Sequence, residues 1–145
     1  MTKHILVPLD GSEPSWAAFE HALDQYEGER ITVLHVADPS NAVYTGVEGG
    51  YYDGAAFDRA LERGEELCDR ARERLEEAGT DSSTVLETAV ERGRPARTIV
   101  RYGDDHDVDL VVIGSHGRSG VSRVLLGSVA ETVVRRAAMP VTVVR

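Results

Sequence analysis

Residues 109 to 128 read DLVVIGSHGRSGVSRVLLGS. The apolar run at 109–114 has the continuous hydrophobic character of a strand buried on both faces. It leads into a glycine-rich loop that ends at Gly127 and Ser128, where a helical pattern begins. Glycine lets the backbone take positive φ and lets consecutive N–H groups approach an anion, which a Cβ would obstruct. This stretch therefore predicts a strand, a phosphate-binding loop and a helix in succession.

Three more apolar runs predict buried strands, and a weaker, more alternating run predicts a strand near an edge. Helical patterns separate them. Their starts carry Ser12 as an N-cap, Pro95 in a first turn, and Ser128 with Glu131 as a capping box. Five strands alternating with four helices predict an α/β fold with a parallel sheet and right-handed crossovers. The strong runs are HILVPL (4–9), ITVLHVA (31–37) and VTVVR (141–145), and the weaker one is TVLETAVERG (84–93).

The size of the chain favours one domain over residues 1–145. A chain of 145 residues and 15.8 kDa can bury roughly two thirds of its unfolded surface in one core. It has no run of about eighteen apolar residues, and MTKHILVPLD lacks the features of a secretory signal. We expect a soluble, cytoplasmic protein that does not bind membranes. The only cysteine, Cys68, excludes an intrachain disulfide and is expected to be a buried core thiol.

The charge of the chain limits its partners. A net charge of −9 argues against an extended nucleic-acid interface, because such binding depends on neutralising phosphates. Lys3 is the only lysine and the other fifteen basic residues are arginine. This excludes a P-loop, disfavours a lysine Schiff base and leaves a receiver domain without its late lysine. The acidic, lysine-poor composition resembles that of halophilic proteins, and we hypothesise that salt stabilises the fold.

Two surface features are expected from the pattern. The stretch DPSNAVYTGVEGGYYDG (38–54) is an unusually long connection, with seventeen residues, four glycines and three tyrosines. Both a lid over a ligand and a disordered or partner-contacting loop fit such a connection. In the helical pattern from about Ala55 to Ala78, Glu66 and Arg70 are spaced to pair on the solvent side.

The topology predicts where a ligand would bind. In an open parallel sheet, ligands bind beyond the carboxyl ends of the strands, where the winding reverses. If the fourth strand lies on the other side of the first, Asp10 and Gly114 meet in one crevice, because they follow these two strands. The loop N–H groups, Arg118, Arg123 and the helix start at Ser128 would then suit a triphosphate. The alternative is that the glycines only serve turns and Ser128 only caps its helix.

Other polar residues near this crevice also admit structural roles. Asp10, next to Gly11 and Ser12, can simply brace the start of the first helix. His35 lies in a predicted buried strand and is expected to be a hydrogen-bonded core or rim residue. His116 lies between two loop glycines, where a general acid or base could act, but no nucleophile, acid pair or orienting carboxylate accompanies it in the sequence. We expect structural or exposed roles for His4, His21 and His106.

Four ordered motifs over nearly the whole chain resemble those of the universal stress protein family. They are ILVPLDGS, VLHVAD, GRPARTIV and the spacing Gly114-x2-Gly117-x9-Gly127-Ser128. The resemblance implies a Rossmann-like (adenine nucleotide alpha hydrolase-like) α/β three-layer sandwich. Its five-stranded parallel sheet would have the order 3-2-1-4-5 and four helices, in agreement with the winding described above.

The same resemblance implies a ligand and a partner. The glycine spacing marks the ATP-binding members of the family, and this sequence keeps it. A divalent cation, Mg²⁺ or Mn²⁺, is expected with the phosphates. A homodimer is expected through the last strand, where Val141 and Val143 belong to an unpaired apolar edge. The residues implied at the adenosine are Pro8, Asp10, Val36 and Ile113, and those at the phosphates are Gly114, Gly117, Arg118, Gly127, Ser128 and Val129.

Three functions fit these features. We favour a dimeric, ATP-binding stress-response module that holds its nucleotide and is at most a weak ATPase, with protein partners that the sequence does not identify. An alternative is a slow ATP hydrolase or nucleotidyl transferase, in which the loop positions water or an acceptor for attack. A third is a structural dimer with an empty crevice, against which the intact glycine spacing argues.

Overall fold

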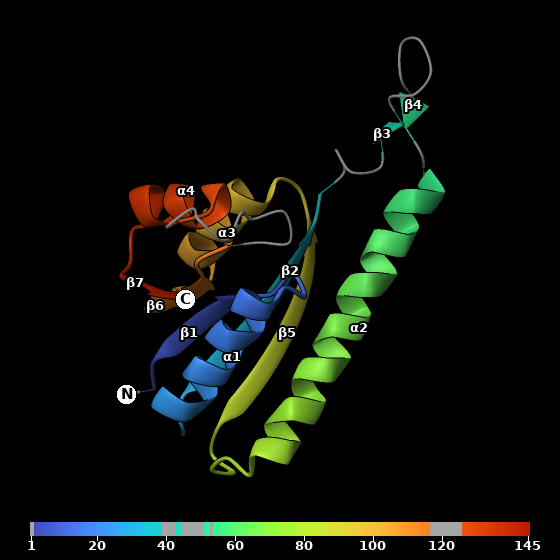
Figure 1. Ribbon diagram of the computed structural model, residues 1–145. Helices are drawn as coiled ribbons and strands as arrows, with labels where there is room; N and C mark the ends of the chain where they lie inside the picture. Colours follow the sequence, from blue (N-terminus) through green and yellow to red (C-terminus); the bar gives the residue numbers. More distant parts are fainter. Residues whose placement is uncertain (1, 39–42, 45–50, 53, 117–125) are drawn as a thin grey trace.

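Five parallel strands form the central sheet of the computed structural model, which describes residues 2–38, 43–44, 51–52, 54–116 and 126–145 (Figure 1). The strand order is β5-β2-β1-β6-β7, which is 3-2-1-4-5 when these five are counted along the chain. All four neighbouring pairs are parallel, so the predicted topology is confirmed. The strands are β1 (His4–Pro8), β2 (Arg30–Ala37), β5 (Val85–Arg92), β6 (Leu110–Gly114) and β7 (Val141–Val144).

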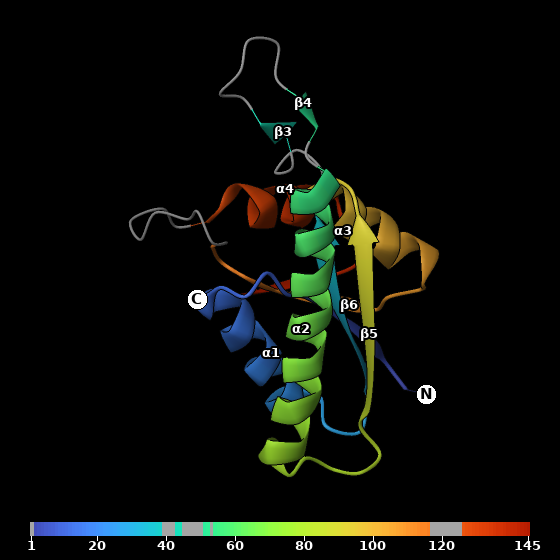
Figure 2. The same ribbon diagram turned by 90° about the vertical axis from the view of Figure 1, so that its right-hand side faces the viewer.

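Helices cover both faces of this sheet, because successive strand side chains point to opposite faces. Ile5 and Val7 share one hydrophobic core with α1 and α2, whereas Leu6 shares the other with α3 and α4. Figures 1 and 2 show α1 and α2 on one side of the sheet and α3 and α4 on the other. This explains the unbroken apolar runs in the sequence. The helices are α1 (Glu13–Gln25), α2 (Gly54–Ala78), α3 (Pro95–Asp105) and α4 (Ser128–Arg136).

The two edges of the sheet differ in length. The weak strand pattern at 84–93 is β5, which lies at one edge as predicted, and Val85 at its start is 50% exposed. The other edge is β7, whose four residues are all half-buried. Both edges therefore present a row of backbone groups on the side away from the sheet.

Part of the long connection forms a hairpin that the sequence pattern did not predict. β3 (Val43–Tyr44) pairs with β4 (Tyr51–Tyr52) in antiparallel fashion, beyond the N-terminal end of α2 (Figure 2). Residues 39–42, 45–50 and 53 lie outside the described residues. The lid and the partner-contacting loop therefore both stay predictions.

The face of α2 that packs on the sheet is built around small residues. Cys68 is buried, as predicted, and burial raises the pKa of its thiol. At Gly64 a Cβ would lie 2.7 Å from Cδ2 of His35. His35 donates a hydrogen bond from Nδ1 to the carbonyl of Leu9 at 2.8 Å, which confirms its expected structural role. Gly64 thus lets the helix lie directly against β2.

At the amino ends of the strands, His4 ties three elements together. It is buried, its Nδ1 donates to the carbonyl of His106 at 3.0 Å, and its Nε2 accepts from the Thr32 hydroxyl at 2.7 Å. Its backbone N–H bonds the carboxylate of Asp109 at 2.8 Å. Burial lowers the pKa of His4 below its ordinary value. His4 is therefore structural, as expected, and His106 is exposed and stacks on Tyr102.

Candidate functional site

The structure brings the two halves of the predicted crevice to one edge of the sheet. β1 lies between β2 and β6, so the winding reverses at β1. Asp10 follows β1, and Gly114 ends β6. Parallel strands end at the same edge, so these residues and Val36 near the end of β2 share it. Pro8, Ile113 and Gly114 are buried, Asp10, Val36, Gly127 and Val129 are half-buried, and Ser128 is exposed.

One backbone hydrogen bond joins Gly127, just before α4, to the end of β6. The N–H of Gly127 donates to the carbonyl of Ser115 at 2.6 Å, and the N–H of Ser115 donates to the carbonyl of Val144 at 2.8 Å. The start of α4 is thereby held beside β6 and the last strand. Gly117 and Arg118, as well as Arg123, lie outside the described residues.

The start of α4 differs from the predicted capping box. Gly127, not Ser128, is the N-cap, and it makes no side-chain capping bond. Ser128 is the first helical residue, and the N–H of Glu131 already bonds the carbonyl of Gly127 at 2.9 Å. The prediction that Ser128 caps this helix was wrong, because the chain reaches the extended N-cap conformation one residue earlier. The first N–H groups of α4 can therefore serve an anion.

The start of α1 is closed by its own side chains. Ser12 is the N-cap, as predicted, and its Oγ accepts a bond from the N–H of Ser15 at 3.3 Å. Oδ1 of Asp10 accepts from the N–H of Ser12 at 2.9 Å and from its hydroxyl at 2.5 Å. Asp10 therefore braces this helix start, which was the structural alternative for this residue. This role does not exclude a ligand, because a carboxylate accepts several bonds.

Gly114 is required for packing. A Cβ at this position would lie 2.5 Å from the carbonyl carbon of Pro14 and 2.8 Å from the nitrogen of Ser15. The end of β6 thus touches the backbone of the first turn of α1. The sequence analysis assigned this glycine to a phosphate loop, and the structure gives it a second role in joining the two sides of the crevice.

His116 has a partner that sequence reasoning missed. Its Nδ1 lies 3.0 Å from the hydroxyl of Ser115, so the two are hydrogen-bonded. Ser115 is only 2% exposed, which keeps its hydroxyl away from a substrate. The pair therefore orients the His116 ring and does not form an accessible nucleophile with a base.

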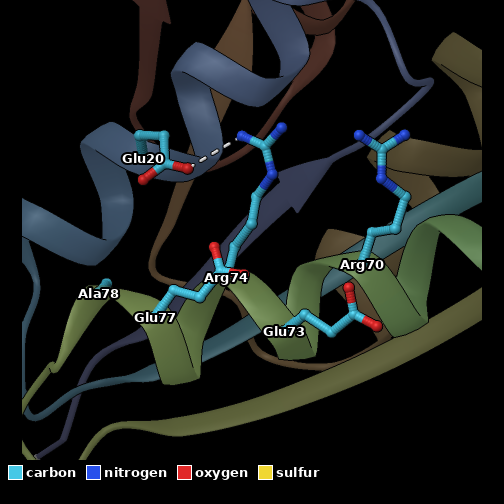
Figure 3. A pocket seen from close by; sticks show the side chains of 6 residues that line it. All are labelled: Glu20, Arg70, Glu73, Arg74, Glu77 and Ala78. Atoms are coloured by element: carbon cyan, nitrogen blue, oxygen red, sulfur yellow. Dashed lines mark hydrogen bonds and ion pairs between the residues drawn. The ribbon is translucent and has the colours of Figure 1, made fainter.

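A second hollow opens from Asp10 toward α2. It has a volume of about 220 Å³ and is lined by Asp10, Gly11, Arg63, Glu66, Leu67 and Arg70. We call it the Asp10 pocket. A larger hollow of about 410 Å³ continues along α2 and shares Arg70 (Figure 3). The expected Glu66–Arg70 ion pair does not occur among the described residues. Arg70 instead lies over Trp16, with its Cζ 5.2 Å from the ring centroid.

Comparison with known proteins fits this geometry. A sequence model of the universal stress protein family matches residues 1–145. A universal stress protein of Methanocaldococcus jannaschii is 34% identical over 99% of this chain and 82% of its own length. The chain belongs to the universal stress protein family. The solved UspA of Lactobacillus plantarum has a TM-score of 0.81 at 27% identity, over 99% of this chain and 97% of that one.

More distant members share the fold of this universal stress protein. A family protein from Arabidopsis thaliana, solved with AMP bound, is 19% identical with a TM-score of 0.67, over 98% of this chain and 90% of that one. The three-layer Rossmann-like arrangement expected from the motifs is therefore confirmed.

The described part of this universal stress protein lacks two kinds of site. None of its helices is both long and apolar enough to span a bilayer. Its His, Cys, Asp and Glu residues form no group of three that could hold a metal ion.

Sequence reasoning missed the α2 side of the crevice. Arg63 and Arg70 are one heptad apart, a spacing that places both on one face of a helix. This face was expected on the solvent side, and Arg63, Glu66 and Arg70 are all exposed. Only the packing of α2 beside α1 brings the two arginines to Asp10.

Proposed function

We propose that this universal stress protein binds an adenine nucleotide, ATP with Mg²⁺ or Mn²⁺, in the crevice between β1 and β6. The observation that carries this proposal is the bond between Gly127 and Ser115, which holds the start of α4 beside the end of β6. That helix start has no side-chain cap, and its N–H groups and dipole favour a phosphate. The AMP bound to the Arabidopsis family protein supports the same class of ligand.

In this proposal, one set of residues binds the adenosine and another binds the phosphates. On the β1 side, Asp10 and Val36 contact the adenosine and Pro8 shapes the wall, while Ile113 lies beside the base. On the α4 side, backbone N–H groups bind phosphate oxygens, which are strong acceptors. The phosphate residues that we propose are Gly114, Gly127, Ser128 and Val129, together with Gly117 and Arg118, which the family motif supplies.

A cation fits this site only together with the nucleotide. The described residues offer no cluster of protein ligands for a metal, whereas clustered phosphate oxygens are good Mg²⁺ ligands. When bound, the cation neutralises phosphate charge. The protein's part is to orient the phosphates at the start of α4.

We favour binding over turnover. The Asp10 carboxylate accepts two bonds from Ser12, and the His116 ring is bonded to the buried Ser115. These contacts brace the start of α1 and orient the His116 ring, and both are structural roles. The nucleotide then acts as a regulatory ligand in the stress response, read by protein partners.

The last strand is the proposed dimer contact. β7 is an edge strand with half-buried Val141 and Val143. Pairing with a second copy would satisfy its outer backbone groups and cover these side chains. On its inner side the strand accepts the Ser115 N–H at Val144, which joins it to the end of β6.

We further propose a cytoplasmic protein adapted to high salt. Its net charge of −9 destabilises the compact state by repulsion, which salt screens. The melting temperature is expected to rise between low salt and molar KCl. A melting temperature that stays constant or falls would contradict this adaptation.

The ligand that copurifies with the protein tests the proposed function. The protein is purified without added nucleotide, denatured, and the released small molecules are separated by chromatography with detection by absorbance. We expect an adenine nucleotide from the wild type and a reduced amount from Gly127→Val, whose side chain would enter the phosphate space. A released ligand of another class, or equal amounts from both proteins, would refute the assignment.

A further inference from the structure

The Asp10 pocket is lined by two arginines that form no ion pair within the described part of the chain. Arg63 and Arg70 line it from α2, opposite Asp10 and Gly11. In the described ranges, neither guanidinium forms an ion pair or a hydrogen bond. On a chain with a net charge of −9, carboxylates are abundant. Arg63 and Arg70 are both exposed, so their guanidinium groups are accessible to an anion from solution.

Arg74 lines the larger hollow next to the Asp10 pocket, and it forms an ion pair. Its Nη1 lies 3.0 Å from Oε1 of Glu20, and its Cζ lies 4.0 Å from the centroid of Trp16. Arg70 shares that indole at 5.2 Å. Figure 3 shows both side chains reaching from α2 toward α1, with Glu20 meeting Arg74 and Glu73 turned away from the Arg70 guanidinium. Stacking on Trp16 orders Arg70 and leaves its donors available to an anion.

Glu66 adds a negative charge to the lining of this pocket. It lies three residues after Arg63 and four before Arg70 and lines the same hollow. Within the described part of the chain it pairs with neither arginine. Its negative charge should weaken anion binding there, so removing it and removing an arginine have opposite expected effects.

The helix that lines the Asp10 pocket and the start of α4 adjoin different strands. α2 packs on β2 and β5, whereas the start of α4 is bonded to the end of β6. The crevice therefore has one flank of helix N–H groups and a second flank of guanidinium groups. A nucleotide whose phosphates all lie at the α4 flank leaves the second flank unused.

We propose that Arg63 and Arg70 form an anion subsite beside Asp10 that takes a second phosphate group, so that an adenine nucleotide with phosphate at two positions binds more tightly than AMP. This inference rests on the proposed nucleotide binding at the α4 flank. The planar guanidinium of Arg70 and the neighbouring Arg63 provide charge-assisted hydrogen bonds to that group.

Calorimetric titration with two ligands tests the subsite. AMP carries phosphate at one position and adenosine 3′,5′-bisphosphate at two. At one fixed salt concentration, the wild type is expected to bind the bisphosphate about five- to tenfold more tightly than AMP. Arg70→Gln and Arg63→Gln should each lower this ratio toward one, and Glu66→Gln should raise it.

Two controls separate charge from folding. Arg59→Gln removes an exposed arginine of the same helix outside the pocket and should keep the wild-type ratio. Arg70→Lys keeps the charge without the planar fork and should retain part of the preference. A ratio near one in the wild type, or an unchanged ratio in Arg70→Gln, overturns the subsite while leaving AMP binding intact. If neither nucleotide binds, the proposed function and the subsite both fall.

Discussion

Two helix starts face the same crevice, and they satisfy their backbone N–H groups in different ways. At α1, Ser12 caps the helix and Asp10 braces the cap. At α4, the N-cap is Gly127, which makes no side-chain capping bond. α1 begins shortly after the carboxyl end of β1. α4 begins at a residue whose neighbour, Gly127, is hydrogen-bonded to the end of β6. The first start is closed by the protein itself, and the second is open to an anion.

The difference shows why a helix start alone does not define a phosphate site. At a capped start, a side-chain oxygen already accepts a hydrogen bond from the first N–H groups of the helix. An uncapped start held in place by a backbone bond, as between Gly127 and Ser115, keeps them available. The end of β6, to which the second start is bonded, touches the first start, because Gly114 lies against the backbone of Pro14. The following substitutions test this difference between the two helix starts.

Gly114→Ala should have the largest effect, because it forces the two sides of the crevice apart. The new Cβ would lie 2.5 Å from the Pro14 carbonyl carbon, and neither backbone can move alone. We expect a loss of about 3 kcal/mol or more in the free energy of unfolding, measured with chemical denaturant. As a control, Gly79→Ala has no atom within 4 Å, and its φ of +60° should cost only about 1 kcal/mol. Equal losses at both positions would contradict the close packing.

Ser128→Asp should close the open start. A carboxylate in the first turn of α4 interacts favourably with the helix dipole, so the free energy of unfolding should stay the same or rise slightly. The same charge should repel phosphates and lower nucleotide affinity about tenfold or more, measured by equilibrium dialysis with ATP and Mg²⁺. An affinity equal to that of the wild type would show that the start of α4 does not bind the phosphates.

One substitution made at both starts compares their caps directly. Ser12→Ala removes the Oγ that accepts the Ser15 N–H and should cost about 1 kcal/mol of folding stability. Ser128→Ala removes no capping bond and should change stability by less than about 0.5 kcal/mol. Thermal denaturation of the two variants measures the difference. The comparison would fail if Ser128→Ala were the more destabilised protein.

Mild acid should lower the free energy of unfolding by a smaller amount, through His4 in the central sheet. The pKa of His4 is lowered by burial, so as the pH falls below about 6.5 the unfolded chain takes up the proton first. This contribution to stability is complete at higher pH and is lost progressively as the pH falls below about 6.5. The carboxylate of Glu87, whose pKa Arg30 lowers, contributes its own loss only at lower pH.

Denaturant unfolding at several pH values checks the role of His4. His4→Gln should flatten the dependence between pH 7 and 5, whereas His21→Gln, on the surface of α1, should keep it. Stability that increases as the pH falls through this range would have the wrong sign for a histidine buried in its neutral form.

Most of the fold follows from hydrophobic patterning. The runs at 4–9, 31–37 and 109–114 are predominantly apolar on both faces, because helices cover both sides of the sheet. The hairpin of β3 and β4 escaped prediction because each strand has only two residues, too few for a periodic signal.

The site was less predictable because it depends on contacts between distant segments. Asp10 and Gly114 were placed correctly at one edge by topology. The capping box at Ser128 failed because Gly127 already occupies the N-cap position. The packing role of Gly114 and the hollow at Arg63 and Arg70 depend on how α1 and α2 lie against the sheet and each other. No local pattern encodes that placement.

Calorimetric titration of ATP with Mg²⁺ into the wild-type protein, at a salt concentration at which it is folded, tests the central claim most directly. The open start of α4, held at the end of β6 by the bond between Gly127 and Ser115, predicts saturable binding of one nucleotide per chain. The absence of binding heat across several temperatures, from protein shown to be free of copurified nucleotide, would contradict it.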